Sequence, residues 1–187
     1  MYFEEQEFRK HHETGQPLQK AVYEQCTFVE CDFSESDLSE IRFGACRFES
    51  CNLSNASLNL SALQEVAFHD CKLLGIRFDQ CKTLAFAVKF VNCQMDHGYF
   101  HALPLQDTQF QNCRLHGADF AEADLRKALF ADCDLLDALF EGCNLEKADF
   151  RTASNYRIHP ERNKLKGAQF ALDGLPGLLL HYGIKIS

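Results

Sequence analysis

The ten cysteines of this 187-residue chain are the residues whose chemistry has to be settled first. A structural zinc site needs two close ligand pairs, typically of the C-x2-C type, that together complete a tetrahedron. No C-x2-C pair occurs here, and most of the cysteines are separated by five residues or a multiple of five. A free cysteine behaves as a small hydrophobe that prefers burial, so we interpret these side chains as reduced interior residues rather than metal ligands. They are Cys26, Cys31, Cys46, Cys51, Cys71, Cys81, Cys93, Cys113, Cys133 and Cys143.

The other side chains that could perform catalysis do not form a recognisable motif. The sequence contains no H-E-x-x-H, G-x-S-x-G, P-loop or dinucleotide-binding glycine pattern. His97 and His101 are four residues apart, but no helix is predicted there, so they would not share a metal-binding face. We therefore expect a protein that is not an enzyme and that uses neither a metal nor a cofactor.

The element that must position these residues is a five-residue repeat. The stretch ADFAEADLRKALFADCDLLDALFEGCNLEKADF, residues 118–150, carries a large apolar residue at every fifth position. One such register runs from Tyr23 to Phe78 and a second from Phe90 to Phe150. A smaller side chain stands two residues before each apolar site, and all ten cysteines occupy that position. A five-residue period fits neither the helical period of 3.6 nor the strand period of 2.

A chain that keeps both repeat positions inside must turn a corner every five residues. Four such sides close a coil of about 20 residues, and stacked coils pair their backbones at roughly 4.8 Å. Each residue then stacks on the residue 20 positions later, which places Phe110, Phe130 and Phe150 in one column. Aspartate or asparagine often precedes the apolar site, as at Asp119 and Asn144, and we interpret these side chains as hydrogen-bonding partners of the corner backbone.

The segments A-D-F-A-E, A-D-L-R-K, C-D-L-L-D and C-N-L-E-K resemble the A(D/N)LXX consensus of pentapeptide-repeat proteins. The resemblance covers about Tyr23 to Phe150 and implies an all-β fold, a right-handed quadrilateral β-helix, followed here by a short C-terminal α-helix. The size, the register break and the tail G-L-L-L-H-Y-G-I-K-I-S resemble the quinolone-resistance (Qnr) and albicidin-immunity branch of the family. That branch implies a dimer joined through the C-terminal helix, which imitates duplex DNA on DNA gyrase or topoisomerase IV.

The register slips between Phe78 and Phe90, which are twelve residues apart instead of ten. Two extra residues must leave the coil within residues 79–89, and a bulge or short loop is the natural way to release them. Phe86 falls outside the apolar register, and two alternatives stand for it: it contacts a partner, or it folds over the break to cover exposed backbone. The predicted partner-binding residues at the break are Lys82, Thr83, Leu84, Phe86 and Lys89.

The formal net charge of −8 argues against direct nucleic-acid binding, which requires clustered lysine and arginine. An acidic chain more plausibly meets a basic protein. The repeats contain acidic stretches, but the segment from Arg151 to Phe170 is basic, which departs from an ideal DNA mimic. If the break does not carry binding, the partner surface is predicted on the acidic faces around Glu30, Glu35, Glu40, Glu122, Asp132 and Asp137.

The tail carries the signals of a short helix. Asp173 is predicted as the helix N-cap, Pro176 lies in the first turn, and Gly183 is placed for a left-handed C-terminal cap. A helix that only caps the rod requires one apolar stripe, and this segment has further apolar residues outside that stripe. We therefore predict a two-fold homodimer interface. Its residues are Leu175, Leu178, Leu179, Leu180, Tyr182, Ile184 and Ile186.

These expectations divide the chain into a lead-in over residues 1–20, a β-helix over 21–153, and an irregular segment with the last repeats and the dimerisation helix over 154–187. No signal sequence or apolar stretch of membrane-spanning length occurs, so we expect a cytoplasmic protein without a membrane association. The predicted function is non-catalytic binding of gyrase or topoisomerase IV and protection from quinolones or a related toxin. The alternative is a scaffold or binding module for another basic protein.

Overall fold

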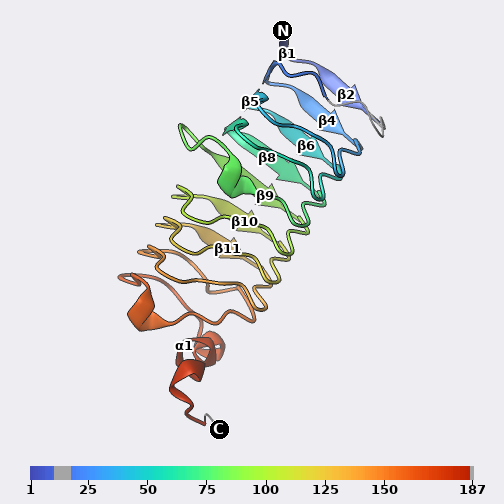
Figure 1. Cartoon of the computed structure of the whole chain (residues 1–187). Helices are drawn as coiled ribbons and strands as arrows, with labels where there is room; N and C mark the ends of the chain where they lie inside the picture. The colour runs from blue at the N-terminus through green and yellow to red at the C-terminus, as the bar shows by residue number, and fades with distance from the viewer. Residues whose placement is uncertain (11–17, 186–187) are drawn as a thin grey trace.

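The chain forms a rod of stacked coils, described by a computed structural model for residues 1–10 and 18–185. Figure 1 shows the coils following one another from the N-terminus to the C-terminus, where a short helical tail ends the stack. The predicted quadrilateral β-helix is confirmed, since every strand pair is parallel and joins residues of neighbouring coils, as in Phe28 with Phe48. No helix in the described ranges is long and apolar enough to cross a bilayer.

Very short strands line two adjacent faces of the rod. One sheet has the order β1-β3-β5-β7 and the other the order β11-β10-β9-β8-β6-β4-β2. The remaining faces are held by isolated parallel bridges such as Asn52 with Lys72. The strands are short because each face holds only a few residues before the next corner. Their bounds are β1 Tyr2–Glu4, β2 Glu7–Arg9, β3 Val22–Glu24, β4 Thr27–Val29, β5 Arg42–Gly44, β6 Arg47–Glu49, β7 Ala62–Gln64, β8 Val66–His69, β9 Val88–Val91, β10 Gln109–Gln111 and β11 Leu129–Ala131.

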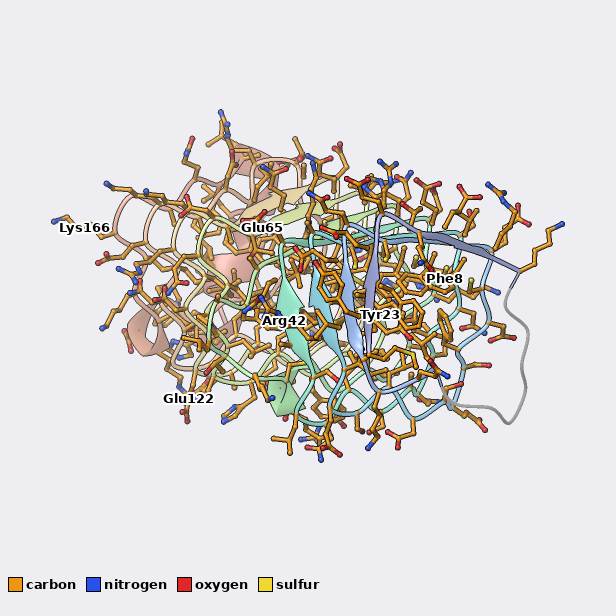
Figure 2. All side chains as sticks on the ribbon, turned by 90° about the horizontal axis from the view of Figure 1, so that it is seen from above. Phe8, Tyr23, Arg42, Glu65, Glu122 and Lys166 are labelled. Carbon is orange, nitrogen blue, oxygen red and sulfur yellow. The ribbon has the colours of Figure 1, made fainter. Side chains whose placement is uncertain are left out.

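The interior is built from columns of large apolar side chains. The rings of Phe110 and Phe130 are stacked with centroids 4.9 Å apart, and Phe130 stacks on Phe150 at 4.8 Å. The neighbouring column meets them edge to face, as in Phe120 against Phe130 at 89°. Both arrangements are favourable for aromatic pairs. Figure 2 views the rod obliquely from above, with the ring of Tyr23 among the core side chains and Lys166 projecting outward.

The corners use the turn chemistry that the sequence predicts. The Asp149 carboxylate accepts a hydrogen bond from the Arg151 N–H at 3.0 Å, and Asp37 accepts one from the Ser39 N–H at 2.9 Å. The hydrogen bonds from Arg151 hold the pKa of Asp149 below its usual value, although partial burial opposes the shift. The residue two positions after the core site is usually left-handed, for example Glu122 at φ 60°. Non-glycine residues rarely adopt this region, so the repeated ladder of hydrogen bonds must hold them there.

The cysteines are buried free thiols, as predicted, but they are more than apolar filler. At one series of corners a side chain from the next coil forms hydrogen bonds with the corner backbone. The Cys51 Sγ accepts a bond from the Cys31 N–H at 3.4 Å and donates to the Phe28 carbonyl at 3.3 Å. Ser61 bonds the Ile41 N–H and the Leu38 carbonyl in the same way. The small side chain therefore satisfies buried backbone groups as well as packing.

The N-terminal residues differ from the predicted lead-in, because they already form part of a coil. Strand β1 pairs with β3 and β2 pairs with β4. Phe3 stacks on Tyr23 at 4.9 Å and Phe8 on Phe28 at 5.0 Å. The signal was present in the sequence, since both phenylalanines stand 20 residues before members of the first register.

The stack also continues beyond Phe150. Phe170 lies on Phe150 at 5.3 Å, and Gln169 bridges to Asp149. Between them, Tyr156 and Ile158 are buried. The helical segments of the chain are η1 Phe78–Gln80, η2 Pro160–Arg162, η3 Leu172–Gly174, α1 Pro176–Leu179 and η4 Leu180–Tyr182.

Candidate partner-binding surfaces

The register break forms a loop between η1 and β9, visible in green where the chain leaves the coil in Figure 1. The pairing of Phe68 with Phe90 shows that 22 residues, instead of 20, separate the two coils. Lys82 and Thr83 are exposed, and Leu84 is 82% exposed. The Phe86 N–H donates to the Thr83 carbonyl at 3.2 Å, which closes the loop. A single exposed leucine is normal on a protein surface, so the loop is a candidate contact surface because it is an insertion held on a regular scaffold.

Phe86 itself is not part of that exposed surface, which corrects its prediction as a partner contact. Its side chain is 7% exposed and belongs to the core. By the stacking rule, position 85 would fill the core column between Leu63 and Leu105. Ala85 is instead left-handed at φ 55°, and the next residue, Phe86, turns inward to fill that place. The alternative in which Phe86 covers the break is therefore the observed one. Lys89 lies on β9 and is half-buried, outside the loop tip.

A hollow of about 450 Å³ lies beside this loop and was not predicted. Its lining combines small residues with two acidic ones, Glu24 and Glu65. Glu24 folds over Gly44, whose missing Cβ leaves the space that the carboxylate occupies. The twenty-residue stacking rule would have brought these residues together. The lining consists of Glu24, Gly44, Ala45, Gln64, Glu65, Ala85, Phe86 and Ala87.

The six acidic residues predicted on the alternative surface do not form one patch. All of them occupy the left-handed corner position, with φ between 52° and 63°. By the stacking rule they lie on three different corners, two on each. The pairs are Glu30 with Asp132, Glu35 with Asp137, and Glu40 with Glu122.

Several of these carboxylates also have a cationic neighbour on the adjoining coil. Lys10 lies 3.4 Å from Glu30 and Lys20 lies 2.7 Å from Glu40. Such exposed ion pairs contribute little stability, but they reduce the negative potential that a basic partner would meet. The acidic corners are thus weaker candidates than the loop.

The C-terminal tail is a chain of short helical turns rather than one regular helix. Asp173 lies within η3 and caps nothing, which corrects its prediction as the N-cap; Leu175 occupies the N-cap position of α1 without a side-chain hydrogen bond. Gly183 is left-handed at φ 66°, as predicted. The irregularity has a local cause, because the glycines at 174 and 177 lower the helix propensity of the segment.

The apolar residues of the tail face two directions. Leu178 packs partly against the core of its own chain, so it acts at least in part as a cap of the rod. Leu180 and Ile184 are 51% and 52% exposed. Ile186 lies outside the described residues. Of the other predicted interface residues, Leu175 and Tyr182 are exposed and Leu179 is half-buried.

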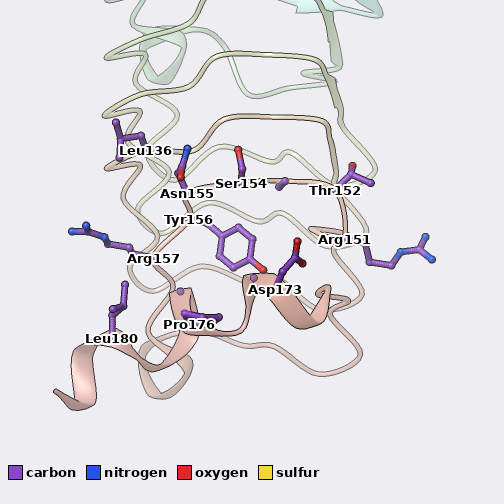
Figure 3. Close-up of a pocket in the computed structure, with 13 residues that line it drawn as sticks. Leu136, Arg151, Thr152, Ser154, Asn155, Tyr156, Arg157, Asp173, Pro176 and Leu180 are labelled. Carbon is purple, nitrogen blue, oxygen red and sulfur yellow. The ribbon is translucent and has the colours of Figure 1, made fainter. Parts of the chain in front are cut away.

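Tyr156 fixes the tail to the last coil, as Figure 3 shows with the ring between the coil and the tail. A Cβ on Gly174 would collide with the Tyr156 hydroxyl, and one on Gly177 would collide with the Tyr156 carbonyl. The Ile158 N–H donates to the Gly177 carbonyl at 3.1 Å. Burial, followed by the charge of Asp173, raises the pKa of Tyr156. The two glycines are therefore required for the close approach of the tail.

Comparisons with known proteins agree with this architecture. A family model described as "Pentapeptide repeat region" matches residues 21–100 and 85–170. Two solved structures of trypsin-treated variants of QnrB1, a plasmid-mediated fluoroquinolone resistance protein, match 100% of this chain and 98% of their own at 18% identity. Their TM-scores are 0.65 and 0.59. HetL, a pentapeptide-repeat protein of the cyanobacterium Nostoc sp. strain PCC 7120, matches 93% of this chain and 86% of its own at 16% identity, with a TM-score of 0.46. No curated protein matches the sequence.

Proposed function

This chain belongs to the pentapeptide-repeat family, and on that premise we propose that it binds DNA gyrase or topoisomerase IV and protects the enzyme from quinolones or a related toxin. In this proposal the chain is a non-catalytic cytoplasmic protein of the Qnr type. The full-length likeness to QnrB1 is a likeness of fold, so support for this function must also come from the surface of this rod.

The observation that carries the proposal is the loop at residues 82–85. The chain inserts two residues there, keeps the core column with Phe86, and exposes Leu84 to solvent. Because the core column continues through the break, the two inserted residues change only the surface of the solenoid. Loops held on a regular scaffold are the usual location of binding residues.

Charge has a secondary role in this proposal. Duplex DNA carries one negative charge per roughly 1.7 Å, which gives about 22 charges over the roughly 38 Å that the coils span at about 4.8 Å each. The net charge of this chain is −8, and its predicted acidic residues are spread over three corners. Charge steers the rod toward a basic groove, while shape and the loop contacts provide most of the affinity.

We further propose that two copies associate through the tail. Leu180, Tyr182 and Ile184 are exposed on the last residues of the tail, and their side chains would supply the apolar surface of this contact. A self-complementary apolar patch of this kind fits a two-fold interface.

A gyrase supercoiling assay with and without ciprofloxacin tests the function. The informative variant deletes Thr83 and Leu84 and keeps Phe86, because the core must stay intact. We expect it to remain folded and to protect about tenfold less well, which corresponds to about 1.4 kcal/mol of contact energy. The matched control is Leu139→Ala, which removes a 48% exposed leucine elsewhere on the rod.

Two results would contradict the proposal. Full protection by the loop deletion would move the partner surface to the acidic corners. If the wild-type chain changes neither supercoiling nor its inhibition by the drug, the topoisomerase assignment fails. The chain would then be a scaffold for another basic protein.

A further inference from the structure

The backbone hydrogen-bond ladder between successive coils stops at the last coil of the rod. On the preceding coils, the Leu115 N–H donates to the Asp134 carbonyl at 2.9 Å and the Leu135 N–H to the Ser154 carbonyl at 3.0 Å. The next donor in this column is the Asn155 N–H, which has no hydrogen-bond partner among the described residues. The chain leaves the stack into η3 before it can supply one.

The same stretch contains further unpaired groups. Within residues 1–10 and 18–185, no acceptor is found for the backbone N–H of Thr152 or Arg157. The Tyr156 side chain is 4% exposed, yet its buried hydroxyl has no partner in the described structure. A buried hydroxyl without a hydrogen bond costs about 1–3 kcal/mol, whereas the amides of Thr152, Asn155 and Arg157 belong to exposed residues and are open to a ligand. The end of the rod is therefore incomplete on this side.

These groups border a hollow of about 480 Å³ between the last coil and the tail. Figure 3 shows Tyr156 in its centre, with its hydroxyl end directed toward Asp173, while Arg151 and Arg157 extend away from it. Arg151 is already paired with Asp149 at 2.7 Å. The hollow thus offers mainly backbone donors and one tyrosine hydroxyl, and no concentrated charge.

We propose that this hollow is a binding site for an extended peptide segment of a partner protein, which adds to the last coil as one more strand. An exposed strand edge is a template for such pairing, and main-chain hydrogen bonds provide its affinity. The peptide carbonyls accept from the Asn155 and Arg157 N–H groups and continue the column of Leu115 and Leu135. A small polar residue of the peptide accepts the hydrogen bond of Tyr156.

The chemistry of the site favours this occupant over a charged ligand. The ladder spacing of the coil matches a peptide backbone by construction, because the coil below pairs with it in the same way. Asp173 disfavours an acidic ligand at the tyrosine, and the guanidinium of Arg151 is occupied. An uncharged Ser or Asn side chain therefore suits the position over Tyr156.

The test uses the full chain and a nine-residue peptide, acetylated and amidated, that copies residues 52–60, NLSNASLNL. Amide NMR and hydrogen exchange follow the N–H groups of Asn155 and Arg157 during titration. We expect shifts and slowed exchange at these amides, and binding at least threefold weaker for Tyr156→Phe, which keeps the ring. A control peptide with proline at alternate positions keeps its carbonyls but loses the N–H groups with which a paired strand donates back to the coil, so it should produce no change.

The remaining outcomes overturn the proposal. Slow exchange at Asn155 in the free protein at every concentration would show that the chain's own tail occupies the hollow. Protection that rises with protein concentration would assign the hollow to a second copy. Peptide-induced shifts elsewhere, or none, would remove the site. The measurement does not involve gyrase, so it stands or fails separately from the proposed function.

Discussion

The Cys51 thiol bridges two backbone groups of the preceding coil and donates to the Phe28 carbonyl at 3.3 Å. We expect Cys51→Ala to lower the free energy of unfolding by about 1–3 kcal/mol, because it removes the two hydrogen bonds that the buried thiol makes with the Cys31 N–H and the Phe28 carbonyl. Cys51→Ser should cost less, since Ser61 performs the same role at its own corner. Urea denaturation of the three proteins measures the difference, and equal midpoints for the Ser and Ala variants would show that the thiol only fills space.

The thiols should be unreactive in the folded protein. Burial raises the pKa of Cys46, Cys81 and Cys143 to about 12, so the reactive thiolate is scarce at neutral pH. We expect Ellman's reagent to titrate the cysteines only after the protein has been unfolded in denaturant. Rapid labelling of several thiols without denaturant would contradict the burial described for them.

Phe130 lies between Phe110 and Phe150 in one aromatic column. Phe130→Asp should prevent soluble folding, because it would bury an unpaired carboxylate. Phe130→Leu is the matched control, since leucine occupies equivalent core sites such as Leu125, and it should fold with reduced stability. Recovery of soluble Phe130→Asp protein with the wild-type melting temperature would refute the column.

The burial of Phe86 gives it a structural role that differs from that of its neighbours in the loop. We expect Phe86→Ala to destabilise the rod by about 3–5 kcal/mol through the cavity it leaves. Leu84→Ala should change stability little, because the side chain is exposed. Thermal melts of both variants compare the effects, and a neutral Phe86→Ala would mean that the column is not continuous at the break.

The tail should control assembly through its exposed residues. We expect Leu180→Glu combined with Ile184→Glu to yield a folded monomer, because charges would enter the proposed interface. Leu178→Glu should instead loosen the tail from its own chain, where Leu178 is partly packed. Sedimentation gives the mass of each protein. An unchanged mass after the double substitution would leave the tail as a cap alone.

The corner aspartates should make the rod sensitive to acid. The pKa of Asp149 is lowered in the folded state by hydrogen bonds from Arg151, so its stabilisation is present above the unfolded pKa near 4 and is lost as pH falls through the lower folded value. Asp149→Asn keeps the acceptor, as Asn144 does toward the Glu146 N–H at 3.2 Å, but cannot titrate. Urea midpoints at pH 7, 4 and 2.5 should therefore fall less steeply for this variant. Parallel curves for both proteins would exclude a contribution from Asp149.

The sequence by itself determined the coil, the stacking of residue i on residue i+20, and the inward direction of the cysteines. This was possible because a repeat constrains each position many times over, so that one physical requirement, the burial of two side chains per five residues, decides the whole fold. It also predicted the turn role of Asp149 and its equivalents, which depends only on neighbours in the chain.

Only the tertiary structure decided what happens where the repeat fails. Ala85 and Asn155 are both left-handed, at φ 55° and 59°, and each turns the following aromatic residue, Phe86 or Tyr156, into the core. The five-residue repeat cannot predict which residue turns inward at these positions. That depends on which aromatic ring fits the core column after the register has shifted. The helical tail was misjudged at Asp173 for a related reason. Its path is set by the close packing of Gly174 and Gly177 on Tyr156, a contact between segments that local capping rules do not contain.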